Sequence, residues 1–239
     1  MTGALYLIPV PLTAAEHLAP ETVLPLSVLE KTRQLRHFVV ERAKSARAFL
    51  KSVQMPVPLQ NLQLAELNEH TPKTALASLL QPLRDGHDLG LISEAGCPAV
   101  ADPGADLVAL AQAQNLRVIP LVGPSSLLLA LMASGLNGQQ FAFHGYLPAK
   151  EEARKTAIRQ LEKESRDKRQ TQLFIETPYR NPALFAALLQ HGQPTTRLCL
   201  ATDVSLATER IRTLSLHEWR RQPPPDIDRR PTVFLLLSA

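Results

Sequence analysis

The sequence predicts an α/β fold with two domains whose sheets are mainly parallel or mixed. Short apolar runs alternate with amphipathic segments of ten or more residues, the pattern of βαβ units. Two of these runs end in loops rich in glycine, proline and serine, as strands do where open α/β sheets present backbone groups to a ligand. With 239 residues, the chain is long enough for one large or two modest domains.

The strands follow from the apolar runs, taken in chain order. The expected strands lie near Leu5–Ile8, Phe38–Glu41, Leu89–Ser93, Arg117–Leu121, Phe141–Gly145, Gln172–Thr177, Arg197–Thr202 and Thr232–Leu237. The last run is apolar almost throughout, which predicts a strand buried on both faces.

Helices are expected between the strands, where apolar residues recur at helical spacing. They lie at Leu26–Leu35, Ala43–Val53, Lys73–Asp85, Ala105–Gln114, Ser125–Ser134, Glu151–Arg169 and Asn181–His191. The segment over residues 121–140 has Gly, Pro and Ser at its ends. We expect the boundary there, between an N-terminal domain over residues 1–122 and a C-terminal domain over residues 123–239.

Composition excludes several classes of protein. Hydrophobic residues make up 45% and charged residues 20% of the chain, as in ordinary globular proteins. No run approaches eighteen apolar residues, which predicts no membrane span, and the first residues lack a basic region of the signal-peptide type, which predicts a cytoplasmic protein. Cys97 and Cys199 are far apart and the seven histidines form no cluster, so reduced thiols and no zinc site are expected.

Two loops are candidate ligand sites. In the loop Ser93–Gly104, two glycines allow close approach of a ligand, and Glu94 and Asp102 offer carboxylates. The alternative is a turn in which Asp102 caps the following helix, and we expect Asp102 to be the cap and residues 93–96 the contact. The second loop, Gly123–Ser126, opens a helix whose unpaired N–H groups are donors for a ligand or simply part of its cap.

Two further segments carry charge. Seven cations lie from Lys31 to Lys51, against only Glu30 and Glu41 as nearby acidic residues, and the whole chain has a formal charge of +4. This segment is either a phosphate-binding surface or a solvated pair of amphipathic helices. In the segment Phe174–Arg180, Glu176 ends a strand and Arg180 follows it. The two are either ligand groups beside a crevice or a buried carboxylate neutralised by an arginine.

Four motifs in one order identify a resemblance. They are Ser93–Gly104, Gly123–Ser126, Phe143–Pro148 and Glu176–Arg180. Together they resemble the tetrapyrrole methylase superfamily, and within it the small-subunit ribosomal RNA methyltransferase I branch. The resemblance runs from about Leu5 to the end of the sequence.

This resemblance implies a class III methyltransferase with two α/β domains, a homodimer, and S-adenosylmethionine bound between the domains. Carried over by position, the cofactor contacts fall on Pro9, Val10, Ser93, Glu94, Ala95, Gly96, Ser125, Ser126, Tyr146, Leu147, Glu176, Thr177, Ala201, Pro231 and Thr232. No metal is implied.

The chain departs from the family pattern mostly in its N-terminal part. Pro11 stands where the first loop of the family has glycine, and Arg42 where it has aspartate. Both histidines of a family motif are absent from Ala65–Glu69, and Glu94 replaces an aspartate. The sequence therefore matches the family motifs for the cofactor more closely than those for the substrate.

The reaction that the resemblance implies is methyl transfer to RNA, at a ribose 2′-hydroxyl of small-subunit ribosomal RNA, and the basic segment Lys31–Lys51 supports an RNA acceptor. A hydroxyl acceptor benefits from a base and from nearby positive charge, and we assign these roles to Glu41 and Lys44. The alternatives are a methyltransferase for a tetrapyrrole or another small molecule, and a protein that binds the cofactor or RNA without catalysis. RNA and a second copy of the chain are the expected partners.

Overall fold

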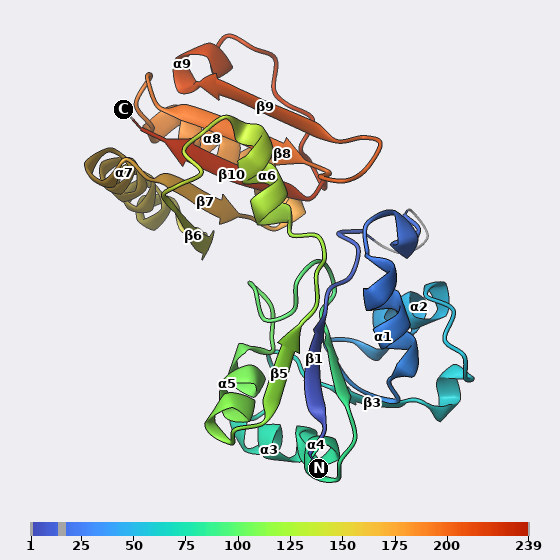
Figure 1. Cartoon of the computed structure of the whole chain (residues 1–239). Helices are drawn as coiled ribbons and strands as arrows, with labels where there is room; N and C mark the ends of the chain where they lie inside the picture. Colours follow the sequence, from blue (N-terminus) through green and yellow to red (C-terminus); the bar gives the residue numbers. More distant parts are fainter. Residues whose placement is uncertain (1, 14–17, 239) are drawn as a thin grey trace. The chain divides into compact units, whose positions relative to one another are not determined.

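The computed structural model describes residues 2–13 and 18–238, which form two compact units. Unit 1 comprises residues 1–125 and unit 2 residues 126–239. From the sequence, the boundary is expected three residues earlier, between residues 122 and 123. Each unit has its own sheet and its own hydrophobic core (Figure 1).

Unit 1 is a parallel five-stranded sheet in the order β3-β2-β4-β1-β5. The strands are β1 (Ala4–Ile8), β2 (His37–Val40), β3 (Gln63–Glu66), β4 (Leu89–Ile92) and β5 (Arg117–Pro120). Helices α1 (Leu26–Gln34) and α2 (Ala43–Ser52) pack on one face of the sheet. The other face is covered by α3 (Leu76–Leu79), α4 (Gln81–Arg84) and α5 (Ala105–Ala113).

Two elements of unit 1 differ from the sequence expectation. Strand β3 was not expected, because it lies at the sheet edge, is only half-buried and has no apolar run. The single helix expected over Lys73–Asp85 is broken into a 3-10 turn, Lys73–Ala75, followed by α3 and α4. Pro82 lies in the first turn of α4, where a proline is tolerated because its missing N–H needs no helical partner.

Unit 2 is a mixed five-stranded sheet in the order β6-β7-β10-β8-β9. The strands are β6 (Phe141–Tyr146), β7 (Thr171–Ile175), β8 (Arg197–Thr202), β9 (Arg210–Ser215) and β10 (Thr232–Leu237). Only β6 and β7 are parallel. The mixed and parallel sheets together confirm the predicted fold class. Strand β9 was not expected, since arginine and polar residues alternate with its apolar ones at the edge of the sheet.

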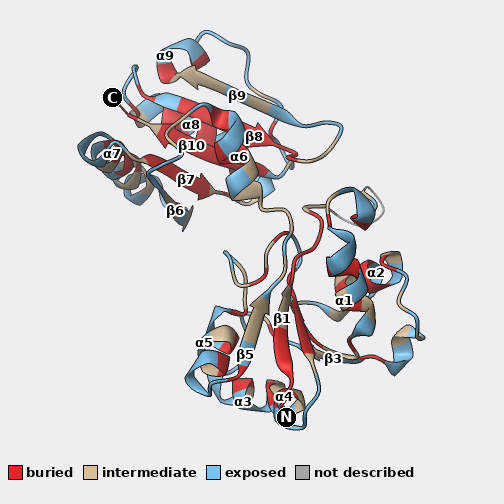
Figure 2. Cartoon of the chain, in the orientation of Figure 1, coloured by how far each residue is buried: buried red, intermediate tan, exposed pale blue. Residues whose placement is uncertain are grey.

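The core of unit 2 lies mainly under α7 (Glu151–Lys168), α8 (Asn181–His191) and α9 (Leu216–Trp219). Helix α6 (Ser126–Ser134) has its contacts with β8, β9 and β10. Strand β10 is central and almost entirely buried, as its apolar sequence predicts, and Figure 2 shows the contrast between buried strands and exposed helix faces.

One buried carboxylate connects α7 to the turn before β8. The side chain of Glu162 accepts hydrogen bonds from the Gln193 amide at 2.7 Å and from the Thr196 hydroxyl at 2.6 Å, and Glu162 is only 3% exposed. Thr196 is fully buried, so without Glu162 its hydroxyl keeps only the long 3.4 Å contact to the Ser238 hydroxyl, and the part-buried Gln193 amide loses its acceptor as well.

We therefore expect Glu162→Ala to lower the free energy of unfolding by about 2–4 kcal/mol in urea titrations. Glu162→Gln keeps an acceptor oxygen and should cost clearly less. Glu164→Ala, on the exposed side of the same helix, is the control and should leave the urea midpoint nearly unchanged. Equal losses for the Ala and Gln variants at position 162 would contradict the assignment.

Candidate functional site

The carboxyl edge of the parallel sheet in unit 1 collects the polar residues of the site. Because all five strands of this sheet are parallel, the segments that follow them leave from one edge. Glu41 follows β2, Ser93 and Glu94 follow β4, and Pro9 and Val10 follow β1. The structure therefore brings together the N-terminal site residues expected from the sequence.

The loop after β4 is held by backbone contacts to its neighbours. The amide of Val10 donates to the Gly96 carbonyl at 2.9 Å, and the amide of Gly96 returns a bond to the Val10 carbonyl at 3.1 Å. Gly96 has a φ of +71° and lies against Leu12 and the Pro124 carbonyl. A side chain at position 96 would thus be strained and crowded, which explains the glycine.

Three carboxylates lie close together at this edge. Burial, followed by the charges of Glu41 and Glu94, raises the pKa of Asp102 to about 6. The pKa of Glu41 is also raised, by burial and then by the charge of Glu94. The amide of Glu94 donates to the Glu41 carboxylate at 3.3 Å. Burial and mutual repulsion thus both disfavour the ionised carboxylates, and the charge of Arg42 offsets this in part at Glu41.

The buried Ser93 hydroxyl belongs to the same group. It has no hydrogen-bond partner of normal geometry, although it is near enough to Asp102 to favour the ionised carboxylate. The expectation that Asp102 caps the next helix is wrong. The N-cap of α5 is Gly104, with a φ of +125° and no side-chain cap, so Asp102 precedes the cap and lies among the carboxylates instead.

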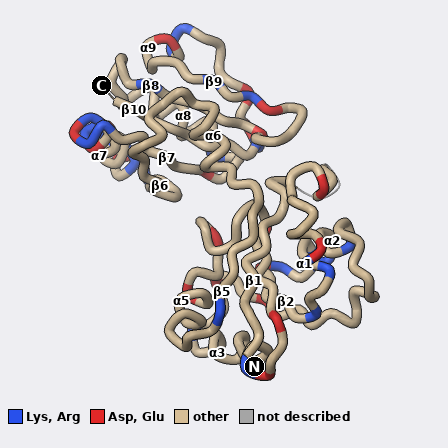
Figure 3. The backbone as a smooth tube through the Cα atoms, in the orientation of Figure 1, with Lys and Arg blue, Asp and Glu red and all other residues tan. Residues whose placement is uncertain are grey.

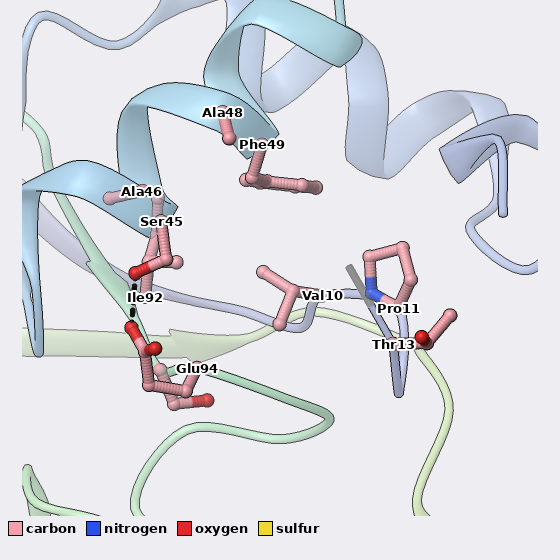
Figure 4. Close-up of a pocket in the computed structure, with 10 residues that line it drawn as sticks. Val10, Pro11, Thr13, Ser45, Ala46, Ala48, Phe49, Ile92 and Glu94 are labelled. Carbon is pink, nitrogen blue, oxygen red and sulfur yellow. Dashed lines mark hydrogen bonds between the residues drawn. The ribbon is translucent and has the colours of Figure 1, made fainter. Parts of the chain in front are cut away.

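A pocket of about 100 Å³ opens beside this loop. Its walls are formed by residues from three segments (Figure 4): Val10, Pro11, Thr13, Ser45, Ala46, Ala48, Phe49, Ile92, Ser93 and Glu94. The Ser45 hydroxyl, in the first turn of α2, donates a hydrogen bond to the Glu94 carboxylate (Figure 4). Ser45 was not among the residues predicted from the sequence. The only feature that could have indicated it is its position at the start of a predicted helix that follows a predicted strand.

The basic segment Lys31–Lys51 is not one surface. Lys31 forms an ion pair with Asp88 at 2.8 Å, and Arg33 donates to the Val53 carbonyl at 2.7 Å. Arg36 donates to two carbonyls of its own chain segment. These three cations are therefore occupied by structural contacts.

The other four cations belong to α2 (Figure 3): Arg42 is its N-cap residue, and three lie within the helix. Lys44, Arg47 and Lys51 are exposed and recur at helical spacing, so they share one face; we name them the cationic face of α2. Within residues 2–13 and 18–238 none of the three forms an ion pair. The cationic face lies on the same helix as the Ser45, Ala48 and Phe49 walls of the pocket.

The two residues expected to act in catalysis are placed differently. Glu41 is half-buried among the carboxylates, and Lys44 is exposed on α2. The charges that shift the pKa of Glu41 are those of Glu94, Arg42 and Glu69, and Lys44 is not among them. Lys44 is therefore placed to meet a ligand from solvent rather than to modulate Glu41.

The C-terminal site residues form a second group, at one end of the sheet in unit 2. Tyr146 lies opposite Ile175, which lies opposite Val233, and Val233 lies opposite Ala201. The other expected residues, Leu147, Glu176, Thr177, Pro231 and Thr232, adjoin this row in sequence. Ser125 and Ser126 stand where the two units meet in the chain.

Glu176 agrees with the structural alternative considered for it. Its side chain is almost fully buried and lies 3.1 Å from the Arg180 guanidinium. It also accepts a hydrogen bond from the Thr177 amide at 2.6 Å. A buried carboxylate neutralised by an arginine therefore accounts for these residues.

The described residues contain neither a membrane-spanning helix nor a cluster of metal ligands. No helix in this part of the chain is long and apolar enough to cross a bilayer. Among the same residues, no group of three or more His, Cys, Asp or Glu side chains is arranged to hold a metal ion.

Comparison with known proteins identifies relatives by sequence. The chain is 31% identical over 223 residues to "Ribosomal RNA small subunit methyltransferase I" of Pseudomonas aeruginosa, covering 91% of this chain and 73% of the relative. The protein of the same name from Vibrio cholerae is 32% identical over 171 residues, covering 72% of this chain and 58% of the relative. No protein-family model matches the chain.

Comparison with solved structures identifies the fold. The crystal structure of the methyltransferase CobJ superposes with a TM-score of 0.64 at 17% identity, covering 100% of this chain and 95% of that one. At this identity the likeness shows a shared fold and nothing further. The fold agrees with the resemblance to tetrapyrrole methylases found in the sequence.

Proposed function

The chain belongs to the ribosomal RNA small subunit methyltransferase I family, and we propose that it transfers a methyl group from S-adenosylmethionine to RNA. The acceptor that we propose is a ribose 2′-hydroxyl of small-subunit ribosomal RNA. The relatives carry this ribosomal name, and the chain spans 73% and 58% of the two relatives compared.

One observation carries the choice of RNA. The cationic face of α2, made by Lys44, Arg47 and Lys51, has no ion-pair partners in the described chain and adjoins the pocket. Exposed unpaired cations along one helix are what a phosphate backbone requires. A small neutral substrate would not need them.

The residues of unit 1 fit a positively charged cofactor. The sulfonium and ammonium groups of S-adenosylmethionine are cations, and a cation would stabilise the ionised carboxylates of Glu41 and Asp102, whose pKa values are raised. The buried Ser93 hydroxyl is a further group that a ligand would satisfy. When bound, the cofactor supplies the electrophilic methyl group.

The residues proposed to hold the cofactor are those named from the resemblance. In unit 1 they are Pro9, Val10, Ser93, Glu94, Ala95 and Gly96, in unit 2 Tyr146, Leu147, Glu176, Thr177, Ala201, Pro231 and Thr232, and at the junction Ser125 and Ser126. Most would contribute backbone groups.

Proton transfer is assigned to Glu41 in this proposal. A base works best when its pKa approaches the working pH, and burial together with Glu94 raises the pKa of Glu41. Lys44 would hold a phosphate of the bound RNA and favour the developing alkoxide through its charge.

A homodimer in the cytoplasm completes the proposal. The outward side of α6 is apolar, with Leu128 52% and Met132 79% exposed, and Phe141 of the edge strand β6 is 42% exposed. Exposed apolar residues of this size are typical of a contact with a second copy. Unit 2 is therefore our choice for the dimer contact.

The test has two steps. Calorimetry with S-adenosylmethionine should detect binding, and tritiated S-adenosylmethionine should label RNA within purified small ribosomal subunits. Nuclease and alkaline digestion would locate the label, since a 2′-O-methyl group makes the next phosphodiester resistant to alkali. Failure to bind the cofactor would refute the proposal, and binding without transfer would indicate a protein that has lost catalysis.

A further inference from the structure

The pocket in unit 1 has a size and lining suited to one ring of a nucleobase. Its volume of about 100 Å³ is far below the roughly 300 Å³ of a site that encloses a whole small molecule. The pocket can therefore accommodate only part of a ligand. This inference rests on the proposed function in that it assumes an RNA substrate.

The walls of the pocket are mostly apolar, and one end, which reaches the surface, is polar. Val10, Pro11, Phe49 and Ile92 form the apolar part, and Ala46 and Ala48 are small enough to leave the space open. Ser45 and Glu94 close one end (Figure 4). A ribose in this space would put hydroxyls against apolar walls without partners, which is costly. A flat ring with one polar edge fits this space, because its faces contact the apolar walls and its polar edge forms hydrogen bonds with Ser45 and Glu94.

The Glu94 side chain is oriented to accept a hydrogen bond. One of its oxygens, Oε1, accepts from the Ser45 hydroxyl, and its amide is held by the Glu41 carboxylate. In the described residues no donor contacts the other oxygen, Oε2. A carboxylate is an acceptor only, and in nucleic-acid recognition it pairs with exocyclic amino groups such as N4 of cytosine.

The surroundings of the pocket supply the phosphate contacts that a nucleotide needs. Lys44, Arg47 and Lys51 lie on the same helix as four of the lining residues, Ser45, Ala46, Ala48 and Phe49. Exposed cations on α2, next to a carboxylate with a free acceptor oxygen, are complementary to a nucleotide, whose phosphate is anionic and whose base can donate.

We propose that this pocket binds an amino-bearing nucleobase of the RNA substrate, with the Glu94 carboxylate accepting the amino proton and Ser45 orienting Glu94. Cytosine, adenine and guanine offer such an amino group at the edge of a six-membered ring. Uracil has a single N–H there, flanked by two carbonyl oxygens that the carboxylate repels. The Glu94 backbone remains available to the cofactor.

The experiment uses fluorescein-labelled uridine heptamers whose central residue is cytidine, adenosine or uridine. Fluorescence anisotropy without cofactor measures their affinities for the full chain. A hydrogen bond to a charged group predicts that the cytidine and adenosine heptamers bind about tenfold more tightly than the all-uridine one.

Three variants test the residues. Glu94→Gln turns an amide donor toward the base, so the preference over uridine should fall at least fivefold or reverse. Ala48→Leu places a larger side chain in the pocket and should remove the preference, while leucine maintains the helix. Glu30→Gln, an exposed residue on α1, changes the net charge equally and should keep the preference.

The outcomes are separable from those of the proposed function. Equal binding of the three heptamers, or a preference that survives Glu94→Gln, overturns the base pocket even if the enzyme methylates RNA. A preference that appears as described, in a protein that labels no RNA, supports the pocket and refutes the methyl transfer.

Discussion

Replacing Lys44, Arg47 and Lys51 together by alanine is expected to weaken RNA binding about 30- to 100-fold at physiological salt. These three residues are exposed on one side of α2 and form no ion pairs within the described chain. Each neutralised phosphate contributes about 0.7 to the slope of log K against log salt for single-stranded RNA. The slope should therefore fall by about 2 in filter-binding titrations with small-subunit ribosomal RNA.

A matched control is available on α7. Lys155, Lys163 and Lys168 are also three helical lysines, and each has an acidic partner three or four residues away. Their triple alanine variant changes the net charge equally and should leave both affinity and slope nearly unchanged. Equal losses in the two triple variants would mean that the overall charge of the protein, and not α2, binds the RNA.

The second large effect concerns the pH dependence of cofactor binding. The pKa of Asp102 is raised to about 6, first by burial and then by Glu41 and Glu94. A cation bound nearby favours the ionised carboxylate, so a proton on Asp102 competes with the cofactor. We expect S-adenosylmethionine to bind about tenfold more weakly at pH 5 than at pH 7.5, because at pH 5 only about a tenth of Asp102 is ionised.

Calorimetry at several pH values and in buffers of different ionisation enthalpy measures both the affinity and the protons released. Asp102→Asn should flatten the pH dependence between pH 5 and 7. Asp106→Asn is the control, since Asp106 lies in the first turn of α5 and pairs with Lys73 at 3.1 Å. An unchanged pH dependence in Asp102→Asn would show that the cofactor does not meet this carboxylate.

The same carboxylate affects stability in a direction that its pKa determines. A carboxyl whose pKa is higher in the folded than in the unfolded protein stabilises the fold below its ordinary pKa near 3.8. That contribution is lost as the pH rises through about 6. Asp102→Asn should therefore raise the unfolding free energy at pH 7.5, by about 1 kcal/mol once solvent screening is allowed for.

Much of the fold could be predicted because it depends on buried, periodic segments. The strands Arg197–Thr202 and Thr232–Leu237 and the helix Asn181–His191 lie where their apolar patterns place them. The missed strands, Gln63–Glu66 and Arg210–Ser215, are edge strands. An edge strand is paired on one side only and need not be apolar, so its pattern resembles that of a loop.

The candidate site was predictable only where a motif marked it. The loop Ser93–Gly96 carries a recognisable pattern, and the structure places it beside Val10 and Glu41. The role of Asp102 was predicted wrongly, because a turn with Asp-Pro-Gly is equally typical of a helix cap. Its neighbourhood depends on residues some sixty positions away, such as Glu41, and no local pattern reports them.

By itself, the sequence determined the α/β class, the order of most elements and the family, since these depend on hydrophobic periodicity and on motifs contiguous in the chain. Only the tertiary structure decided which polar groups meet. It showed that Lys31 and Arg33 are engaged in structural contacts. The cationic face of α2, from the same run of cations, is exposed. The tertiary structure also joined Ser45 to Glu94 across 49 positions. The physical reason is that the type of a residue determines its charge and its hydrogen-bonding groups. Which partner it contacts depends on how distant segments pack in the folded protein.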